Sequence, residues 1–131
     1  MAAKCKSILS AGELIRPALL QNPDIAATVT KVFPVVTTKA DLPYISYRRL
    51  SLEAVAVKGT PARAAEIEVL CFGRTYSQSV EMAEAVCSAL DGAELTSADG
   101  SLTLRSCMLT DAEETWQDDA WVQRLIFTVR I

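Results

Sequence analysis

The segment from Ser77 to Leu90 constrains the possible fold more than any other, because its apolar residues recur at helical spacing. The predicted apolar face consists of Val80, Met82, Ala83, Val86, Cys87 and Leu90. The opposite, polar face consists of Ser77, Glu81, Glu84, Ser88 and Asp91. This pattern predicts a surface helix that lies on a sheet. Gly92 is suited to end the helix, because glycine readily adopts the left-handed conformation common at that position.

Segments rich in β-branched, aromatic or alternating apolar residues predict strands on both sides of this helix. They are Tyr44–Leu50, Ala65–Arg74, Leu102–Thr110 and Trp121–Ile131. In the last of them, alternation predicts an inward face that starts at Trp121 and includes Leu125 and Phe127. The stretch 51–64 between the first two strands is interpreted as the extension of a long hairpin or as a loop.

The N-terminal part predicts a helix within Ser7–Gln21, where Leu14, Ile15, Ala18 and Leu19 form an apolar stripe. Ser10 and Glu13 resemble a capping box, which would begin the helix at Ala11. Pro17 instead favours a later start, near Glu13, or a bend. Two short elements are expected next, a helical turn from Asn22-Pro23 through Ala27 and an extended stretch at Lys31–Phe33.

The predicted order is therefore helix, two strands, helix, two strands. A length of 131 residues fits one domain, so we expect residues 1–131 to form a single domain. The economical arrangement is an α+β fold: a mainly antiparallel sheet of about four strands, with the two main helices packed on one face. Val69, Leu90, Leu125 and Phe127 are expected to be buried together between sheet and helix.

The chain contains no histidine. This absence removes the commonest general base and the commonest metal ligand, so Ser-His-Asp and Cys-His machinery cannot be built. Catalysis by carboxylates or lysine is still possible in principle. The net charge of −3 also argues against a dedicated nucleic-acid binder, which usually carries a basic excess.

No stretch approaches the roughly 20 apolar residues that would span a bilayer, so no membrane association is expected. The apolar residues after Lys4 and Lys6 are interrupted by Ser10, Gly12 and Glu13, which argues against a signal peptide and predicts a cytoplasmic protein. The cysteines are scattered, with no C-x-x-C pair, and are expected to be reduced and mostly buried. They are Cys5, Cys71, Cys87 and Cys107.

Two groups of opposite charge are candidates for a subunit interface. The basic group consists of Arg48, Arg49, Lys58 and Arg63. The acidic group, in a predicted loop, consists of Asp111, Glu113, Glu114, Asp118 and Asp119, with Trp116 among them as a possible interface anchor or loop-pinning residue. The simpler interpretation of each group is a solvated loop, and the acidic group could also line a lumen through which DNA passes. Its spacing does not match a calcium loop, so no metal or cofactor is expected.

The order of several short segments resembles the phage tail terminator and tail-completion (head–tail joining) protein family. The matching segments are Asn22-Pro23-Asp24-Ile25, Val32-Phe33-Pro34, Leu42-Pro43-Tyr44-Ile45-Ser46-Tyr47, Ile67–Phe72, Thr75-Tyr76-Ser77 and Ala89-Leu90-Asp91-Gly92. The resemblance implies a structural protein, without catalytic residues, that forms a ring capping the tail tube. Its partners would be the tail tube and the head–tail connector. It would be found in the host cytoplasm during assembly and in the virion tail afterwards. Some members stay monomeric until they meet the tube.

Two other functions are compatible with the residues alone. One is a generic α+β protein-binding or regulatory module of the host, without a phage role. The other is a small enzyme that uses carboxylates. Neighbouring genes for tail and connector proteins would favour the ring subunit, whereas metabolic neighbours would exclude it.

Overall fold

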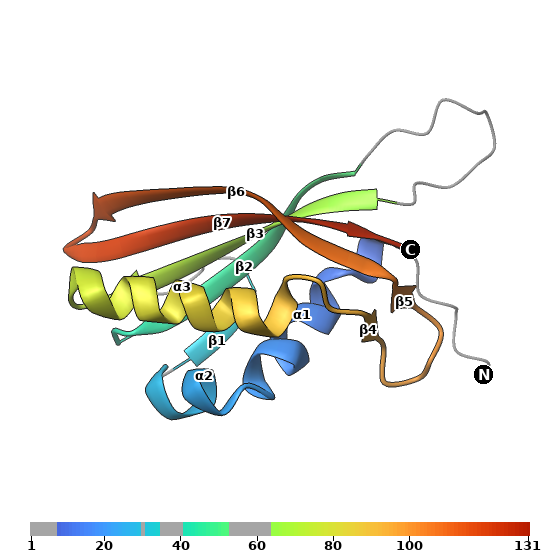
Figure 1. The fold of residues 1–131 in the computed structure, drawn as a ribbon, viewed down its shortest axis with the longest axis horizontal. Coiled ribbons are helices and arrows are strands. Elements are labelled where there is room, and N and C mark those ends of the chain that lie inside the picture. The colour runs from blue at the N-terminus through green and yellow to red at the C-terminus, as the bar shows by residue number, and fades with distance from the viewer. Residues whose placement is uncertain (1–7, 30, 35–40, 53–63) are drawn as a thin grey trace.

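A five-stranded sheet carries the described helices on one of its faces (Figure 1). The computed structural model describes residues 8–29, 31–34, 41–52 and 64–131. Its elements are a 3-10 turn Ile8–Ser10, α1 Gly12–Leu20, α2 Pro23–Thr28, β1 Lys31–Pro34, β2 Tyr44–Leu52, β3 Ala64–Gly73, α3 Tyr76–Leu90, β4 Leu95–Thr96, β5 Thr103–Leu104, β6 Ser106–Gln117 and β7 Ala120–Arg130. The predicted α+β class, with helices on one face, is confirmed.

The sheet differs from the expected one in the number and direction of its strands. Its order is β1-β2-β3-β7-β6, and β1 runs parallel to β2 while the other neighbours are antiparallel. The sheet is thus mainly antiparallel as predicted, but it has five strands rather than about four, and the parallel pairing of β1 was not expected. The extended stretch at Lys31–Phe33 is too short to show its pairing in the sequence, yet it aligns residue by residue with the start of β2.

The first two helices begin in different ways. Asn22 caps α2 as predicted, because its Oδ1 atom accepts hydrogen bonds from the backbone N–H groups of Asp24 and Ile25. The predicted capping box at Ser10 is wrong: Ala11 occupies the N-cap of α1, and no side chain caps that end. Ser10 instead belongs to the preceding 3-10 turn. Pro17 lies inside α1.

The helix α3 confirms the central prediction. Thr75 caps it by accepting a hydrogen bond from the Gln78 N–H group, and its polar face is exposed as expected. The buried face consists of Ser79, Met82, Ala83, Val86 and Leu90. Val80 and Cys87 are only partly buried. The buried face is therefore centred on Met82 and Val86.

The main core lies between the helices and the sheet. Val69, Leu90, Leu125 and Phe127 all belong to it and are at most 3% exposed, which confirms the predicted cluster. Burial of each large apolar side chain stabilises the fold by about 1.5–3 kcal/mol, so this layer of many such side chains contributes strongly to stability. This packing holds β3 and β7 in place. The residues of these strands that alternate with the core residues point to the second face of the sheet.

The predicted loop 111–119 is a strand, and this is the largest correction to the predicted fold. β6 continues to Gln117 and pairs with β7 along its length, and the hairpin closes through Asp118 and Asp119. Both turn residues have positive φ, 51° and 60°, as a two-residue hairpin turn requires. The acidic composition suggested a loop, but cross-strand partners on β7 stabilise the extended conformation.

The predicted strand Leu102–Thr110 is divided in the structure. Thr103 and Leu104 form β5, which pairs with β4 in a separate two-stranded sheet, and β6 begins at Ser106. At the junction, the Arg105 N–H group donates to the Arg130 carbonyl oxygen over 2.8 Å. The chain therefore passes from the two-stranded sheet to the five-stranded sheet. The alternation of apolar residues had predicted a single strand for this segment.

Candidate assembly interface

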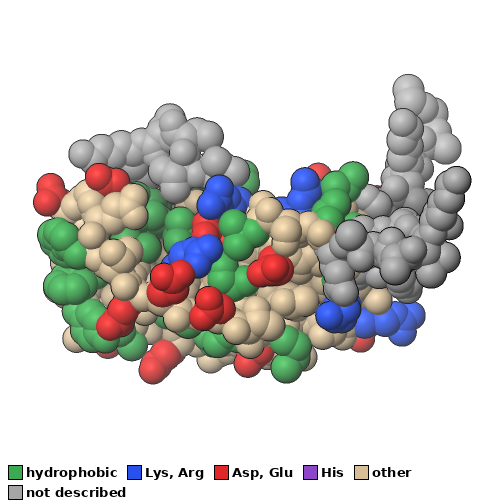
Figure 2. Space-filling model, turned by 90° about the horizontal axis from the view of Figure 1, so that it is seen from above, with side chains coloured by type: hydrophobic (Ala, Val, Ile, Leu, Met, Phe, Trp, Pro, Cys, Tyr) green, Lys and Arg blue, Asp and Glu red, His purple; other side chains and the backbone are tan. Residues whose placement is uncertain are grey.

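The second face of the sheet, away from the helices, carries a line of charged side chains across its middle (Figure 2). Glu68 on β3 accepts from the Arg48 Nε–H group on β2 over 2.8 Å and from the Arg124 Nε–H group on β7 over 2.6 Å. Arg124 Nη1 also donates to Glu113 on β6 over 2.5 Å. Four neighbouring strands are thus linked by alternating charges on a single face.

Glu68 is the centre of this line. Its side chain is only 4% exposed, whereas those of Arg48 and Arg124 are 54% and 32% exposed. Burial alone raises the pKa of the Glu68 carboxyl, but hydrogen bonds from Arg124 and Arg48 outweigh burial and hold that pKa below its usual range. The carboxylate is therefore charged at neutral pH, and its ion pairs link β3 to β2 and to β7.

A second, smaller apolar cluster lies on the same face, toward the β6–β7 turn. It consists of Phe33, Tyr44, Phe72, Ala120 and Val122. The Tyr44 ring stacks on Phe72 with centroids 4.4 Å apart and meets Phe33 at 5.5 Å. Both Tyr44 and Phe72 are buried there. The second face is thus apolar at one end and ionic in the middle.

Three aromatic rings gather at the tip of the β6–β7 hairpin, beside the start of α3. Trp116 and Trp121 are directly opposite each other, with centroids 5.1 Å apart, and Tyr76 packs edge-on to Trp121 at 5.5 Å. Trp121 was expected in the core, but it is 36% exposed. Its strand position points toward the helix layer, as predicted, but α3 begins at Tyr76 and does not extend over it. Trp116 is 53% exposed.

Polar contacts hold these rings in place. The Tyr76 hydroxyl donates to the Glu114 carboxylate over 2.9 Å, and the Gln123 side-chain amide donates to the same oxygen over 3.1 Å. The hydrogen bond to Glu114 raises the pKa of the Tyr76 hydroxyl above its ordinary value. The Tyr76 hydroxyl is therefore already paired within the chain, and its ring lies against Trp121.

The structure separates the residues of the predicted interface. Arg48 and Arg49 point to opposite faces: Arg48 joins Glu68, while Arg49 Nη1 donates to the Leu9 carbonyl oxygen over 3.1 Å. Lys58 and Arg63 lie outside the described residues. In the acidic group, Glu113 faces Arg124 on the second face, Glu114 and Trp116 face the helix side, and Asp118 and Asp119 form the turn. Asp111 is exposed on β6 and accepts from the Ala112 N–H group.

Sequence reasoning missed Glu68, Arg124 and Tyr76. Alternation in the sequence puts Glu68 and Arg124 opposite the apolar faces of their strands, but nothing in the sequence shows that the two strands are neighbours. Their contact depends on the register Leu70↔Arg124, which sets Arg124 diagonally across from Glu68. The available signal was the opposite charge of residues on two outward faces, and this becomes informative only once the strand order is known.

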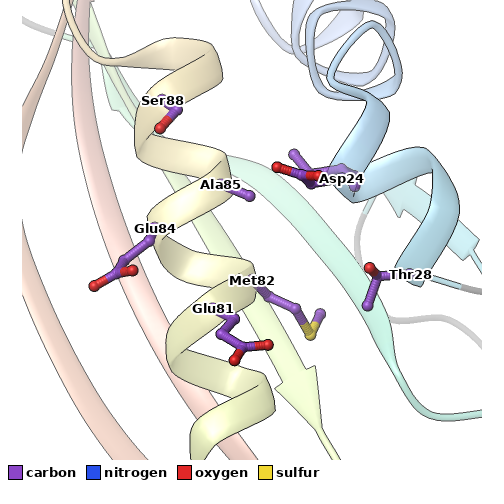
Figure 3. A pocket seen from close by; sticks show the side chains of 8 residues that line it. Asp24, Thr28, Glu81, Met82, Glu84, Ala85 and Ser88 are labelled. Carbon is purple, nitrogen blue, oxygen red and sulfur yellow. The ribbon is translucent and has the colours of Figure 1, made fainter.

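A groove of about 430 Å³ lies between α2 and α3 (Figure 3). Its lining comprises Asp24, Ile25, Thr28, Glu81, Met82, Glu84, Ala85 and Ser88. None of these eight lining residues is basic. Across the described part of the chain, no group of three or more cysteine, aspartate or glutamate side chains is arranged to hold a metal ion. Nor does that part contain a helix long and apolar enough to cross a membrane.

Comparison with known proteins identifies the family. The family model described as tail completion protein gp17 matches residues 13–131. The chain belongs to this family. Its function is accordingly a structural one in completing phage tails, which agrees with the resemblance noted in the sequence. A search of curated proteins finds no match to the chain.

Two solved structures have a similar fold. A chain of the virion of a native gene transfer agent particle superposes with a TM-score of 0.73 at 23% identity, covering 95% of this chain and 98% of that chain. The gp17 protein of bacteriophage SPP1 gives a TM-score of 0.59 at 13% identity, covering 100% of this chain and 96% of that one. The fold of this tail-completion protein is thus shared by two proteins of low sequence identity.

Proposed function

We propose that this tail-completion protein is the subunit of a homo-oligomeric ring, within a virion tail, that caps the tail tube and joins it to the head. The observation that carries the proposal is the family match over residues 13–131. The similar chain from a gene transfer agent virion supports a place among other structural proteins of a particle. We further propose that residues 1–131 act as one terminator-like domain and that the role is not enzymatic.

The stiffness of the sheet supports this role. A ring subunit must hold its contact surfaces in a fixed relation, because small errors in rotation prevent closure. Here a buried apolar layer fixes one face, and the Glu68 ion pairs link neighbouring strands across the other. Contact surfaces on such a scaffold keep their relative orientation when a neighbouring subunit binds.

We propose a smaller set of the charged candidates as contacts between subunits. Arg48 forms an ion pair with the buried Glu68, so reversing Arg48 would place a second carboxylate beside Glu68 and disturb the sheet. The hydrogen bond from Arg49 to the Leu9 carbonyl oxygen is exposed instead, so Arg49, Lys58 and Arg63 are the better basic residues to reverse together. The triple variant should fold normally and assemble poorly, because each exposed pair contributes only about 0–1 kcal/mol but several act together.

The test of the ring is genetic and structural. The gene is deleted from the phage or prophage that carries it, and particles are imaged with and without a complementing copy. We expect heads and tails that fail to join, or tails of irregular length, and a closed ring of this protein at the head-proximal end of complemented tails. Normal joined particles from the deletion strain would contradict the proposal.

A further inference from the structure

The groove between α2 and α3 has an acidic rim and an apolar floor. Asp24 on α2 and Glu81 on α3 are exposed at its rim. The floor includes the buried side chains of Ile25 and Met82, which are 1% and 3% exposed. Figure 3 shows Asp24 pointing toward α3 and Met82 pointing toward α2. The groove therefore combines negative charge with apolar surface.

Asn22 holds the two walls of the groove together. Its Oδ1 atom accepts from the N–H groups of Asp24 and Ile25, and its Nδ2 atom donates to the Ala85 carbonyl oxygen over 3.4 Å. One side chain thus caps α2 and connects it to α3. A groove with walls fixed in this way loses less conformational freedom when a partner binds.

The carboxylates at the rim are free to pair with a partner. In the described part of the chain, the Asp24 and Glu81 carboxylates make no hydrogen bond or ion pair. The acidic side chains of β6 differ, since Glu113 pairs with Arg124 and Glu114 accepts from Tyr76. The groove is therefore the better receiving surface for a cation.

Most basic side chains of the described residues cannot supply this cation, because they already have a partner within the chain. Some donate to backbone carbonyl oxygens, others pair with Glu68, and one lies over an aromatic ring. In that order they are Arg16, Arg49 and Arg74; Arg48 and Arg124; and Lys31.

The segment 53–63, which lies outside the described residues, has a suitable composition. It contains Lys58 and Arg63, and no acidic residue follows Glu53 within it. Val55 and Val57 precede Lys58, so apolar side chains accompany the cations. This combination complements an acidic rim above an apolar floor.

The groove and the ends of this segment lie on opposite sides of the molecule. Figure 1 shows the end of β2 and the start of β3, which flank residues 53–63, at the upper right, whereas α2 lies at the lower left. Two unlike surfaces placed in this way produce head-to-tail association, which closes into a ring when the rotation per subunit allows it.

We infer that the α2–α3 groove of one copy binds the segment 53–63 of the next copy. The inference rests on the proposed ring, and it names the counterpart of Lys58 and Arg63. A volume of about 430 Å³ falls within the roughly 300–1,000 Å³ of pockets that accept small ligands, so the groove admits a few side chains. It is one anchor within an interface that typically covers roughly 800 Å² per partner.

The primary experiment places a photo-reactive p-benzoylphenylalanine at position 28, because Thr28 is exposed and lines the groove. Complete particles are irradiated, covalent dimers are separated from monomers on a denaturing gel, and their crosslinked peptides are identified by mass spectrometry. We expect dimers that join position 28 of one copy to residues 53–63 of another. Met108, which is 49% exposed on the second face, is the control position and should not give that product.

The second experiment reverses the charge of the rim. Glu81 is exposed, so Glu81→Lys should fold as the parent protein does. We expect about a tenfold loss of the dimer crosslink and of joined particles, because attraction becomes repulsion. Adding Lys58→Glu and Arg63→Glu should restore part of both. Glu94→Lys makes the same change at an exposed position outside the groove and should behave as the parent protein.

Several results would overturn the inference. They are a crosslink from position 28 within the same copy, to another region of a second copy or to a different virion protein, and the absence of any crosslink in particles that contain the ring. Assembly of Glu81→Lys at the parent level in low salt would do the same. Each of these leaves the proposed ring intact, since imaging of the particles reports the ring independently. Absence of the ring from complemented tails would instead overturn the proposed function.

Discussion

Gly73, the last residue of β3, lies where the start of α3 comes closest to the sheet. A Cβ atom on Gly73 would lie 2.8 Å from the Ser79 backbone nitrogen, and backbone cannot move aside as a flexible side chain can. We predict that Gly73→Ala lowers the free energy of unfolding by about 1–3 kcal/mol, the range for overpacking. Urea denaturation measures the change.

Gly12 provides the matched control, because a Cβ there would sit 4.0 Å from the Tyr47 ring, an ordinary contact distance. Alanine is also the better helix former, so Gly12→Ala should be neutral or stabilising by up to about 1 kcal/mol. Equal effects of the two substitutions would contradict the close approach of α3 to Gly73.

Glu68 should make stability depend on acidity. Its pKa is lower in the folded than in the unfolded chain, so its contribution is complete above the unfolded value and is lost as pH falls through the folded one. We predict that the urea midpoint of the parent protein declines below about pH 4.5, the unperturbed value. Glu68→Gln should be less stable at pH 7 by about 1–3 kcal/mol and less sensitive to this decline.

Glu66→Gln is the companion variant for this measurement, since Glu66 is exposed and accepts only a 3.3 Å hydrogen bond from Ser51 among the contacts described. Its pH profile should follow that of the parent protein. A Glu68→Gln profile parallel to the parent profile would show that the ion pairs do not couple to folding.

At the scale of secondary structure, β7 is the strand on which the core depends. Phe127 is fully buried beneath the helices and pairs with Ile67 on one side and Leu109 on the other. We predict that Phe127→Ala costs about 3–5 kcal/mol, the range for a buried aromatic side chain. A denaturant midpoint equal to that of the parent protein would mean that β7 is shifted by one residue, which would turn Phe127 outward.

The elements with a regular apolar period were predictable, and those stabilised across strands were not. α3 and β7 show their buried faces in the sequence, so both were located to within a residue or so at each end. β6 has exposed side chains through most of its length, and its conformation depends on partners such as Arg124 and Trp121. Such partners are invisible until strand order is known, which is why its acidic half was predicted as a loop.

For the whole molecule, we expect salt to weaken assembly more than folding. If the exposed turn carboxylates Asp118 and Asp119 contact a neighbouring protein in the tail, ions screen the attraction, with a Debye length of about 10 Å at 0.1 M and 3 Å at 1 M. We expect the yield of joined particles to decrease as salt is raised during assembly. Unfolding of the isolated protein should respond much less, because Glu68 is buried.

Purified parent protein and Asp118→Asn with Asp119→Asn can be compared on tail tubes across the same range of salt. The variant should show a flatter dependence, since it lacks two of the charges. Identical slopes would assign the salt effect to other surfaces. The candidate interface was only partly predictable at this scale: the sequence identified Trp116 and the turn carboxylates, whereas Tyr76 comes near Trp121 and Glu114 only in the fold.

The outer strand β6 pairs with β7 on one side, and within the described residues no strand covers its other side. Its backbone could recruit a strand from another molecule, a common route to aggregation. Asp111, Glu113 and Glu114 place negative charge along that edge, and an irregularity between Leu109 and Asp111 interrupts its hydrogen-bonding register. Two such edges repel each other, so copies of this protein are disfavoured from pairing edge to edge through β6.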